Sequence, residues 1–363
     1  METFLSYFSM VSDFRVLGRC LHNLSDILGL VLCGVLSDCD TFVDICDYGK
    51  DNQVFLQDEL GFSFSHGIPS EDTLERIFKH LDTKELEECY SKLAKEMSMS
   101  FRQIMIDGKE LRSCIPKGKK HSLVQLVNVW VSDLSLSFGQ VKVDKKSNEI
   151  EAIPALLKMI NCENSVVSID AIGCQKDIVS DIVDKKADYV IALKKNQKGL
   201  YEQIETEFSR CLSDLPCHES RDLDHGRAEH RKVYLLEDLR FVEMTKEWKK
   251  LNSVVMVERN IWREGELKTT KRFYISSLCD KTPKQMGGYI RNHWAIENQL
   301  HWQLDVTFKE DDSRVRAENA IINLHLIRKW TLFLLKKEPS KISLNRKRKK
   351  AARNNQFLKS ILE

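Results

Sequence analysis

The sequence lacks a hydrophobic run long enough to cross a membrane, since its most apolar stretch, residues 27–36, has about half the length that a spanning helix needs. Residues 1–10 also lack the basic start and the continuous apolar segment of a secretory signal. The eleven cysteines include no C-x-x-C pair, so neither a cysteine-based zinc site nor a disulfide framework is indicated. Together, these absences predict a cytoplasmic protein with free thiols and no membrane contact.

A nucleotide-binding loop is also missing. Neither Gly108-Lys109 nor Gly118-Lys119 is followed by serine or threonine at the end of a Walker-type run. No nucleotide cofactor is therefore expected.

Positive charge is concentrated near the C-terminus, although the net charge of the whole chain is only +2. Residues 336–353 carry nine Lys or Arg and one Glu, including the run RKRKK at residues 346–350. Such a run is most often a solvated tail, and the alternative is contact with DNA phosphates through Arg346, Lys347 and Arg348. We predict a basic tail over residues 336–363.

Periodicity predicts a small helical domain over residues 1–97. Apolar residues recur at helical spacing from Leu24 to Val35, and residues 69–72 combine Pro, a hydroxyl cap and two acids in the manner of a helix start. A further helix is expected at residues 84–97. This part of the chain shows no catalytic constellation, and packing or DNA contact is all that follows from it.

The pattern changes at Phe101 and predicts a mixed α/β domain over residues 98–335. Strands are expected at residues 103–106, 123–131, 134–143, 166–169 and 188–193, with helices at residues 154–160, 178–183, 289–312 and 320–335, the last of them amphipathic. Strands at residues 232–236, 253–262 and 267–277 predict a β-rich insertion at about 215–280. Thr282 and Pro283 can open a helix, with Thr282 as its cap and Pro283 in its first turn. Gly287 and Gly288 weaken that helix, which leaves a start at Tyr289 as the alternative.

Two aspartates each follow an apolar strand, Asp107 after residues 103–106 and Asp170 after residues 166–169. If these strands are parallel neighbours, the two carboxylates meet at one edge of the sheet. Glu297 lies amid apolar residues in the predicted helix, where an unpaired carboxylate is costly to bury. Three such acids could hold two divalent ions, although a turn or helix cap is an equally good interpretation of each aspartate alone.

Eight sequence blocks resemble the H-repeat-associated family, which comprises insertion-sequence transposases of the DDE type. They are GIPSEDTLERIF (67–78), IDGKELR (106–112), KSNEI (146–150), SIDAIGCQKDI (168–178), DYVIALKKNQ (188–197), HGRAEHR (225–231), HWAIENQLHWQLDVTFKED (293–311) and SLNRKRKKAARNNQFLKSIL (343–362). The blocks run nearly from end to end of the chain, and their ordered set is far more specific than any single one.

This resemblance implies a ribonuclease-H-like mixed sheet with a β-rich insertion, preceded by the helical domain. It places the catalytic, metal-binding acids at Asp107, Asp170 and Glu297, with two Mg²⁺ or Mn²⁺ ions. The implied reaction is cleavage and strand transfer at the inverted-repeat ends of an insertion sequence. The implied partners are double-stranded DNA, both transposon ends and target, and a second copy of the chain on that DNA. The implied location is the nucleoid of a bacterial cytoplasm.

Further residues near these acids are candidates for DNA contact. They are Lys109 and Arg112 after the first acid, Lys194, Lys195, Asn196 and Gln197 after a strand, His225 and Arg227 in the insertion, and Arg291 and His293 before Glu297. Exposed loop cations, and a helix cap for Asn196, are the plainer alternatives. Trp294 and Trp302 are expected to pack in the core.

One departure from related transposases concerns the cations around the glutamate. The relatives often carry Y-x2-R-x3-E-x6-K, whereas the corresponding positions here hold Ile290, His293 and Leu304. Which basic group grips phosphate beside the cut, whether His293, Arg291 or Lys309, is left open by the sequence.

Three rival functions remain. A zinc enzyme could use His293, Glu297 and His301, but the two-residue gap of an H-E-x-x-H helix is absent. A non-catalytic DNA-binding relic of a mobile element would commonly have lost one acid, whereas all three are present. A structure-specific nuclease on the same core would cut DNA without joining it.

Overall fold

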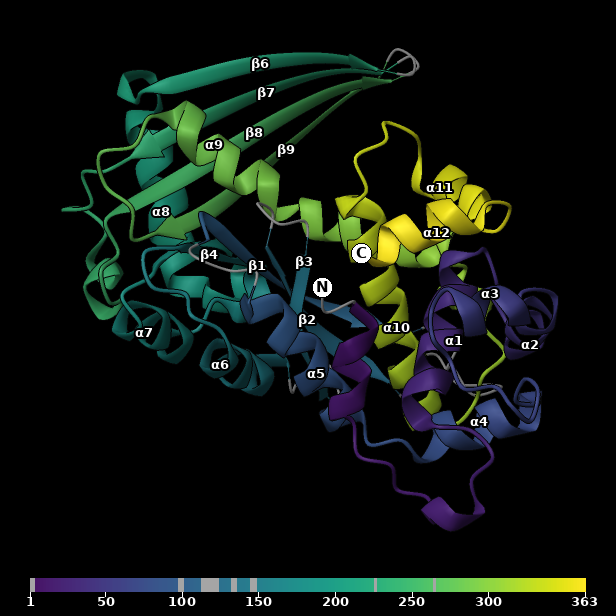
Figure 1. Ribbon diagram of the computed structural model, residues 1–363. Coiled ribbons are helices and arrows are strands. Elements are labelled where there is room, and N and C mark those ends of the chain that lie inside the picture. Colours follow the sequence, from purple (N-terminus) through teal and green to yellow (C-terminus); the bar gives the residue numbers. More distant parts are fainter. Residues whose placement is uncertain are drawn as a thin grey trace.

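The structure is a computed structural model that describes residues 4–96, 101–111, 124–131, 136–143, 149–224, 227–263 and 266–363. A mixed α/β part built on one large sheet lies beside a group of helices from both ends of the chain (Figure 1). The mixed α/β class and the helical N-terminal region predicted from the sequence are thereby confirmed.

The N-terminal region contains five α-helices among the described residues: α1 (Leu24–Leu36), α2 (Phe42–Asp51), α3 (Gln53–Asp58), α4 (Glu71–His80) and α5 (Thr83–Glu96). Helix α1 is buried along almost its whole length, because its apolar residues recur on every face. Helix α4 begins after Ser70 with two acids in its first turn, as the sequence predicts. The apolar core of these helices is continuous with the core under the sheet.

The sheet has nine strands in the order β3-β2-β1-β4-β5-β9-β8-β7-β6. The strands are β1 (Gln103–Glu110), β2 (Gln125–Val131), β3 (Leu136–Val143), β4 (Val166–Ile169), β5 (Asp188–Leu193), β6 (Cys217–Asp224), β7 (Arg227–Leu236), β8 (Ser253–Arg263) and β9 (Glu266–Ser276). Strands β1, β4 and β5 are parallel to their neighbours in this group, and the remaining pairs are antiparallel. The predicted insertion therefore extends the central sheet through the β5–β9 pair instead of forming a separate subdomain.

Alternation along the strands assigns the two faces of the sheet to different helices. On β9, Tyr274 packs with Met286 and Ile290 of α9 (Pro283–His293), whereas Phe273 packs against Phe208 of α8 (Lys198–Cys211). Helices α6 (Glu149–Met159) and α7 (Lys176–Asp184) also pack against the sheet (Figure 1). Helix α9 thus packs on the same face of the sheet as Tyr274, and the chain continues from it to Glu297.

Helix α10 (Glu318–Lys337) joins the sheet to the helical group. The helix predicted at residues 320–335 is confirmed, but these residues are all buried, including Arg328 and Lys329, so its predicted amphipathic character is wrong. Lys329 is accommodated because its ammonium donates to the side chains of Asn128 and Gln140 in the sheet, both at 3.2 Å. No helix among the described residues is long and apolar enough to span a membrane.

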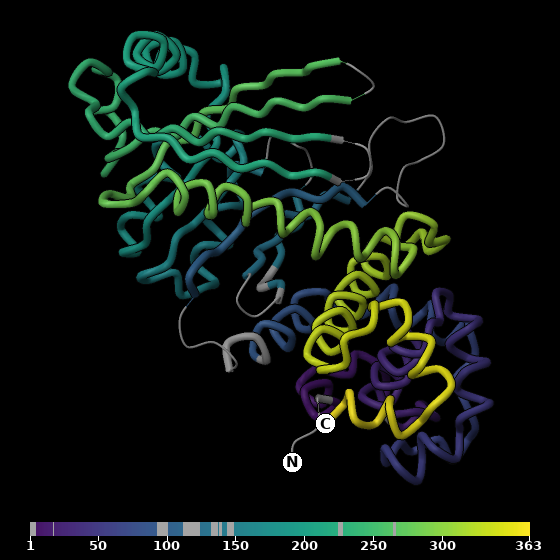
Figure 2. The backbone as a smooth tube through the Cα atoms, turned by 90° about the horizontal axis from the view of Figure 1, so that it is seen from above, coloured from purple at the N-terminus to yellow at the C-terminus, as the bar shows by residue number. Residues whose placement is uncertain are grey.

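The C-terminal basic segment is folded, because it forms α11 (Leu344–Ala351) and α12 (Asn355–Leu362), which lie against the N-terminal helices (Figure 2). Arg348 is 1% exposed and Lys347 is 4% exposed. The Lys347 ammonium donates to the carbonyl of Leu335 at 2.8 Å and pairs with Glu338 at 2.9 Å. The prediction of a solvated tail is therefore wrong, because the segment forms two packed helices.

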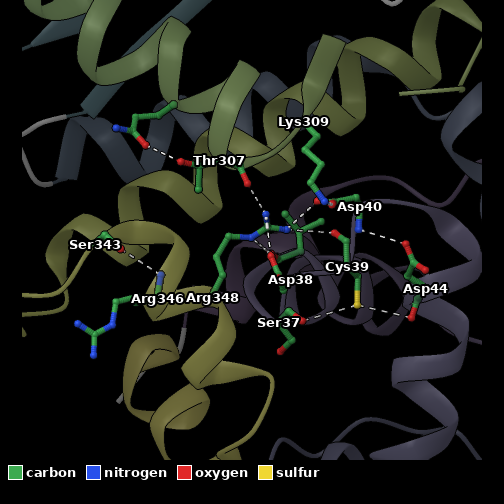
Figure 3. Close-up of polar contacts among 12 residues, drawn as sticks. Ser37, Asp38, Cys39, Asp40, Asp44, Thr307, Lys309, Ser343, Arg346 and Arg348 are labelled. Carbon is green, nitrogen blue, oxygen red and sulfur yellow. Dashed lines mark hydrogen bonds and ion pairs between the residues drawn. The ribbon is translucent and has the colours of Figure 1, made fainter. Parts of the chain in front are cut away.

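Arg348 connects three distant parts of the chain (Figure 3). Its guanidinium donates to the backbone carbonyls of Val35, Cys39 and Thr307 and pairs with the carboxylates of Asp38 and Asp40. Arg346 on the same helix is exposed and points away from this cluster. Of the three residues expected to contact phosphate, Arg346 is therefore accessible to DNA, whereas Lys347 and Arg348 are buried.

Candidate active site

The strand register makes Asp107 and Asp170 neighbours. Strands β1 and β4 are parallel, with Ile106 opposite Ile169, so the two aspartates follow directly on adjacent strands. Asp107 is not at a strand tip, because β1 continues beside β2 as far as Glu110 after its pairing with β4 has ended. Asp170 also accepts a hydrogen bond from the backbone N–H of Ile172 at 2.9 Å, so it caps the following turn as well.

Helix α9 carries the chain towards these aspartates. It begins at Pro283, the earlier of the two predicted starts, and not at Tyr289, because Thr282 and Gln285 form a capping box that outweighs the two glycines. Its far end is fixed by Gln103 of β1, whose amide donates to the carbonyl of Tyr289 at 2.8 Å. Gln103 also donates to the Ser168 hydroxyl at 3.0 Å, and Ser168 lies 3.1 Å from Nδ1 of His293.

Gln103 and Ser168 were not identified by the sequence analysis as part of the site. Ser168 is the single polar residue of the apolar strand β4, and Gln103 directly precedes the apolar residues 104–106 of β1. Both side chains are buried, and a buried polar group requires a hydrogen-bond partner. Both side chains serve to dock α9 on β1 and β4.

The helical backbone changes from α to π at the glutamate. Segments η9 (Glu297–His301) and η10 (Gln303–Thr307) are π-helical, a rare conformation that is frequent at functional sites. Glu297 is exposed, while the ring of His301 is turned inward, with Nδ1 3.6 Å from Oδ2 of Asp107. Trp294 and Trp302 are 38% and 52% exposed, so the core packing expected for them is wrong.

The three acids share one electrostatic environment. Burial, together with the negative charges of Asp170 and Glu297, raises the pKa of Asp107 to about 7. Partial desolvation of its carboxylate also raises the pKa of Glu297, although the residue as a whole is exposed; the charge of Arg272 opposes this effect and that of Asp170 reinforces it. Adjacent carboxylates that resist ionisation together are typical of sites that bind a cation.

A divalent ion fits this donor set. Mg²⁺ and Mn²⁺ prefer carboxylate oxygens, and a cation would relieve the repulsion that raises the pKa of Asp107. As the side chains lie, no three His, Cys, Asp or Glu of the described ranges are gathered closely enough to hold a metal ion.

A fourth carboxylate, that of Glu149 at the start of α6, also lies beside Asp107. A Cβ atom at Gly108 would be only 2.7 Å from Oε1 of Glu149, so a larger residue at position 108 would make the flexible Glu149 side chain move aside. Glu149 adds to the negative charge that raises the pKa of Asp107. In the sequence, Glu149 stands within the KSNEI block, and no role was predicted for it.

Lys109 is placed inside the protein, which corrects its expected phosphate contact. It is 5% exposed, and its ammonium pairs with Asp305 and with Glu310, the latter at 3.5 Å. Glu310 in turn contacts His325 at 2.8 Å. Lys109 thereby ties β1, close to Asp107, to the segment that follows Glu297.

Asn196 and Gln197 also have internal partners. The Asn196 amide donates to the carbonyl of Ala171 at 2.7 Å, and the Gln197 amide donates to that of Cys174 at 2.8 Å. They hold the turn after Asp170, and the side-chain helix cap suggested for Asn196 is not formed. The DNA contact of these two residues stays a prediction. Lys194 and Lys195, just before them, are exposed.

The other residues predicted to contact DNA are partly buried, exposed or outside the described residues. Burial lowers the pKa of His293 to about 4, so this ring is neutral and positions α9 instead of binding phosphate. Arg291 is exposed and lies 3.2 Å from Asp222. Arg112 and His225 lie outside the described residues, as does the side chain of Arg227, whose backbone pairs with Asp224.

A family model described as a transposase DDE domain matches residues 99–334, and one described as DDE_Tnp_1-associated matches residues 5–94. The chain belongs to the DDE transposase family. YncI of Escherichia coli O157:H7, which has a provisional transposase name, is 36% identical over 100% of this chain and 95% of its own length. The H repeat-associated protein YhhI of strain K12, also provisionally named a transposase, is 35% identical over 100% of this chain and 98% of its own. The resemblance to the H-repeat-associated family is thus confirmed.

Two further similarities are weaker. YbfQ of Escherichia coli K12, named an inactive transposase, is 35% identical over 21% of this chain and 89% of its own length. A piggyBac transposase synaptic complex with hairpin DNA aligns with 99% of this chain and 77% of that chain, at 12% identity and a TM-score of 0.47, which is too low to support an argument.

Proposed function

We propose that this DDE transposase cuts DNA at the inverted-repeat ends of an insertion sequence and joins the freed 3′ ends to target DNA. The observation that carries the proposal is the register of β1 and β4, which makes Asp107 and Asp170 neighbours within electrostatic reach of Glu297. The sheet order β3-β2-β1-β4-β5 supports a ribonuclease-H-like core for this part of the chain.

In this proposal, the carboxylates of Asp107, Asp170 and Glu297 hold two Mg²⁺ or Mn²⁺ ions. When bound, such ions activate the attacking oxygen and neutralise charge on the leaving oxygen. Gln103, Ser168 and His293 hold the helix of Glu297 on the sheet, and Asn196 and Gln197 hold the turn after Asp170. Water first attacks the phosphodiester at the end of the element, and the 3′ oxygen leaves as a free 3′-hydroxyl. This 3′-hydroxyl then attacks a phosphodiester of the target strand and displaces one of its bridging oxygens.

The proposed partners are the two transposon ends, the target DNA and a second copy of the chain on that DNA, because two ends must be cut together. The exposed cations Lys194, Lys195, Arg291 and Arg346 support contact with the phosphate backbone. Binding through such contacts weakens steeply as salt rises. Work on DNA also implies a place at the bacterial nucleoid.

Two alternatives share this family membership. An inactive or domesticated DNA-binding relic has a precedent in the relative that is named inactive, but all three acids are present here. A structure-specific nuclease would use the same acids and would cut without joining.

The test is cleavage of a labelled duplex that carries the inverted repeats flanking this gene, with Mg²⁺, Mn²⁺ or EDTA. We expect metal-dependent nicking at the repeat boundary and no cutting in EDTA, because water activation requires the ion. Binding without cutting in any metal would support the relic. Cutting that ignores the repeat sequence would support the plain nuclease.

A further inference from the structure

A pocket of about 560 Å³ lies where the long strands of the insertion face the end of α9 and the start of η9. The residues that line it from the sheet alternate along three neighbouring strands, with Arg231 on β7, Arg259 on β8 and Arg272 on β9. Arg231 is directly opposite Arg259, and Arg272 is opposite Val257, two residues away from Arg259. Because side chains at alternate positions share a face, these three arginines project together towards α9.

The charges in this pocket are only partly compensated. The carboxylate of Glu229 is shared by Arg231 and Arg259, each at 2.7 Å, and Arg291 faces the exposed Asp222 at 3.2 Å. Among the residues that the structure describes, Arg272 has no carboxylate as an ion-pair partner, and no acid lines the pocket itself. The pocket therefore has a net positive charge, with Arg272 as its least compensated cation.

Arg272 is also held close to the catalytic glutamate. Its guanidinium lies over the ring of Trp294, 5.2 Å from the ring centroid, and Trp294 is three residues before Glu297. Asn298 and Gln299, directly after Glu297, complete the same side of the pocket with amide groups. Stacking on an aromatic ring restricts the guanidinium and so lowers the entropy lost when it binds an anion.

We propose that this pocket binds a phosphate of the DNA backbone beside the bond that is cut, and that Arg272 is its principal ligand. The inference rests on the proposed function, since it places DNA across Glu297. A cluster of carboxylates repels a polyanion, so a fixed cation beside it is needed to hold the strand in place. A guanidinium suits this role because its paired N–H groups match two phosphate oxygens. Arg272 thus supplies, from the insertion, the cation that His293 and Leu304 do not.

Two substitutions on one strand test the proposal in the full-length protein. Arg272→Gln removes the proposed ligand, whereas Lys271→Gln removes one positive charge from the opposite face of β9, where Lys271 lies 3.9 Å from Glu258. Binding of the repeat-end duplex is measured in EDTA over a range of salt concentrations, and cleavage is measured at saturating protein. For Arg272→Gln we expect the slope of log affinity against log salt to fall by about one, and the cleavage rate to fall about a hundredfold.

Lys271→Gln should leave the cleavage rate within about twofold of the wild type. Arg272→Lys should keep the salt slope but recover only part of the cleavage rate, because lysine has charge without the paired donors. An unchanged slope and rate in Arg272→Gln, or equal losses in both glutamine variants, would overturn the proposal. The slope is measured without metal, so it still tests the pocket if the wild-type protein fails to cut.

Discussion

Replacing Asp170 with asparagine should abolish cleavage of the repeat-end duplex while leaving its binding intact. Asparagine keeps the side-chain oxygen that accepts from the N–H of Ile172 at 2.9 Å, so the turn after β4 should persist. It loses the negative charge that would hold a divalent ion. Because such an ion stabilises the transition state by several kcal/mol, the cleavage rate should fall about a thousandfold or more. Affinity for DNA should be equal or slightly higher, since one repulsive charge is removed.

The matched control for this prediction is Asp177→Asn, which makes the same chemical change at an exposed position in the first turn of α7. Single-turnover cleavage and a gel-shift titration of the same duplex report rate and affinity separately. Cleavage by Asp170→Asn at the rate of the control would rule out a metal-binding role for Asp170.

Arg348→Met should destabilise the protein by about 3–5 kcal/mol. The substitution leaves three backbone carbonyls without their donor and two carboxylates without their counter-charge (Figure 3). Methionine fills part of the volume but cannot donate a hydrogen bond, and unsatisfied buried groups are costly. The expected loss is large because Arg348 joins α11 to the N-terminal helices and to the end of η10.

Arg346→Met is the control for the second prediction, because it makes the same change on an exposed face of α11. Its unfolding free energy should stay within about 0.5 kcal/mol of the wild type. Urea denaturation followed by circular dichroism measures both variants. Equal small effects would show that the C-terminal helices are not docked through Arg348.

Local sequence patterns predicted the elements whose signal is local. Strands β4 and β5 were predicted with their observed bounds, because each is a short apolar run bounded by polar residues. Strand β6 was missed, since CHESRDLD has no apolar alternation and owes its pairing to β7. The observed start of α9 was one of two predicted, because Thr282 and Pro283 signalled it while Gly287 and Gly288 argued for Tyr289. The pairing of Thr282 with Gln285 and the space that Gly287 leaves for Val233 favour the earlier start, and the second of these is a tertiary feature.

The candidate site was predictable to a similar degree. Asp107 and Asp170 were predicted because each follows an apolar stretch, although β1 continues past Asp107 as far as Glu110. Glu297 was predicted chiefly from the family resemblance. Lys109 and Arg348 were misjudged because their partners lie about 200 and 300 residues away in the chain, so nothing beside them in sequence reveals those partners. The arginines of the pocket were overlooked because they meet only through strand register.

The most direct test of the central claim is the position of Mn²⁺ in crystals of the full chain, located by anomalous scattering. The account predicts anomalous density between the carboxylates of Asp107, Asp170 and Glu297, and loss of that density in Asp170→Asn. Manganese held elsewhere, for example by His293 and His301, would contradict it. So would the absence of any ion at these carboxylates in a preparation that cuts repeat-end DNA.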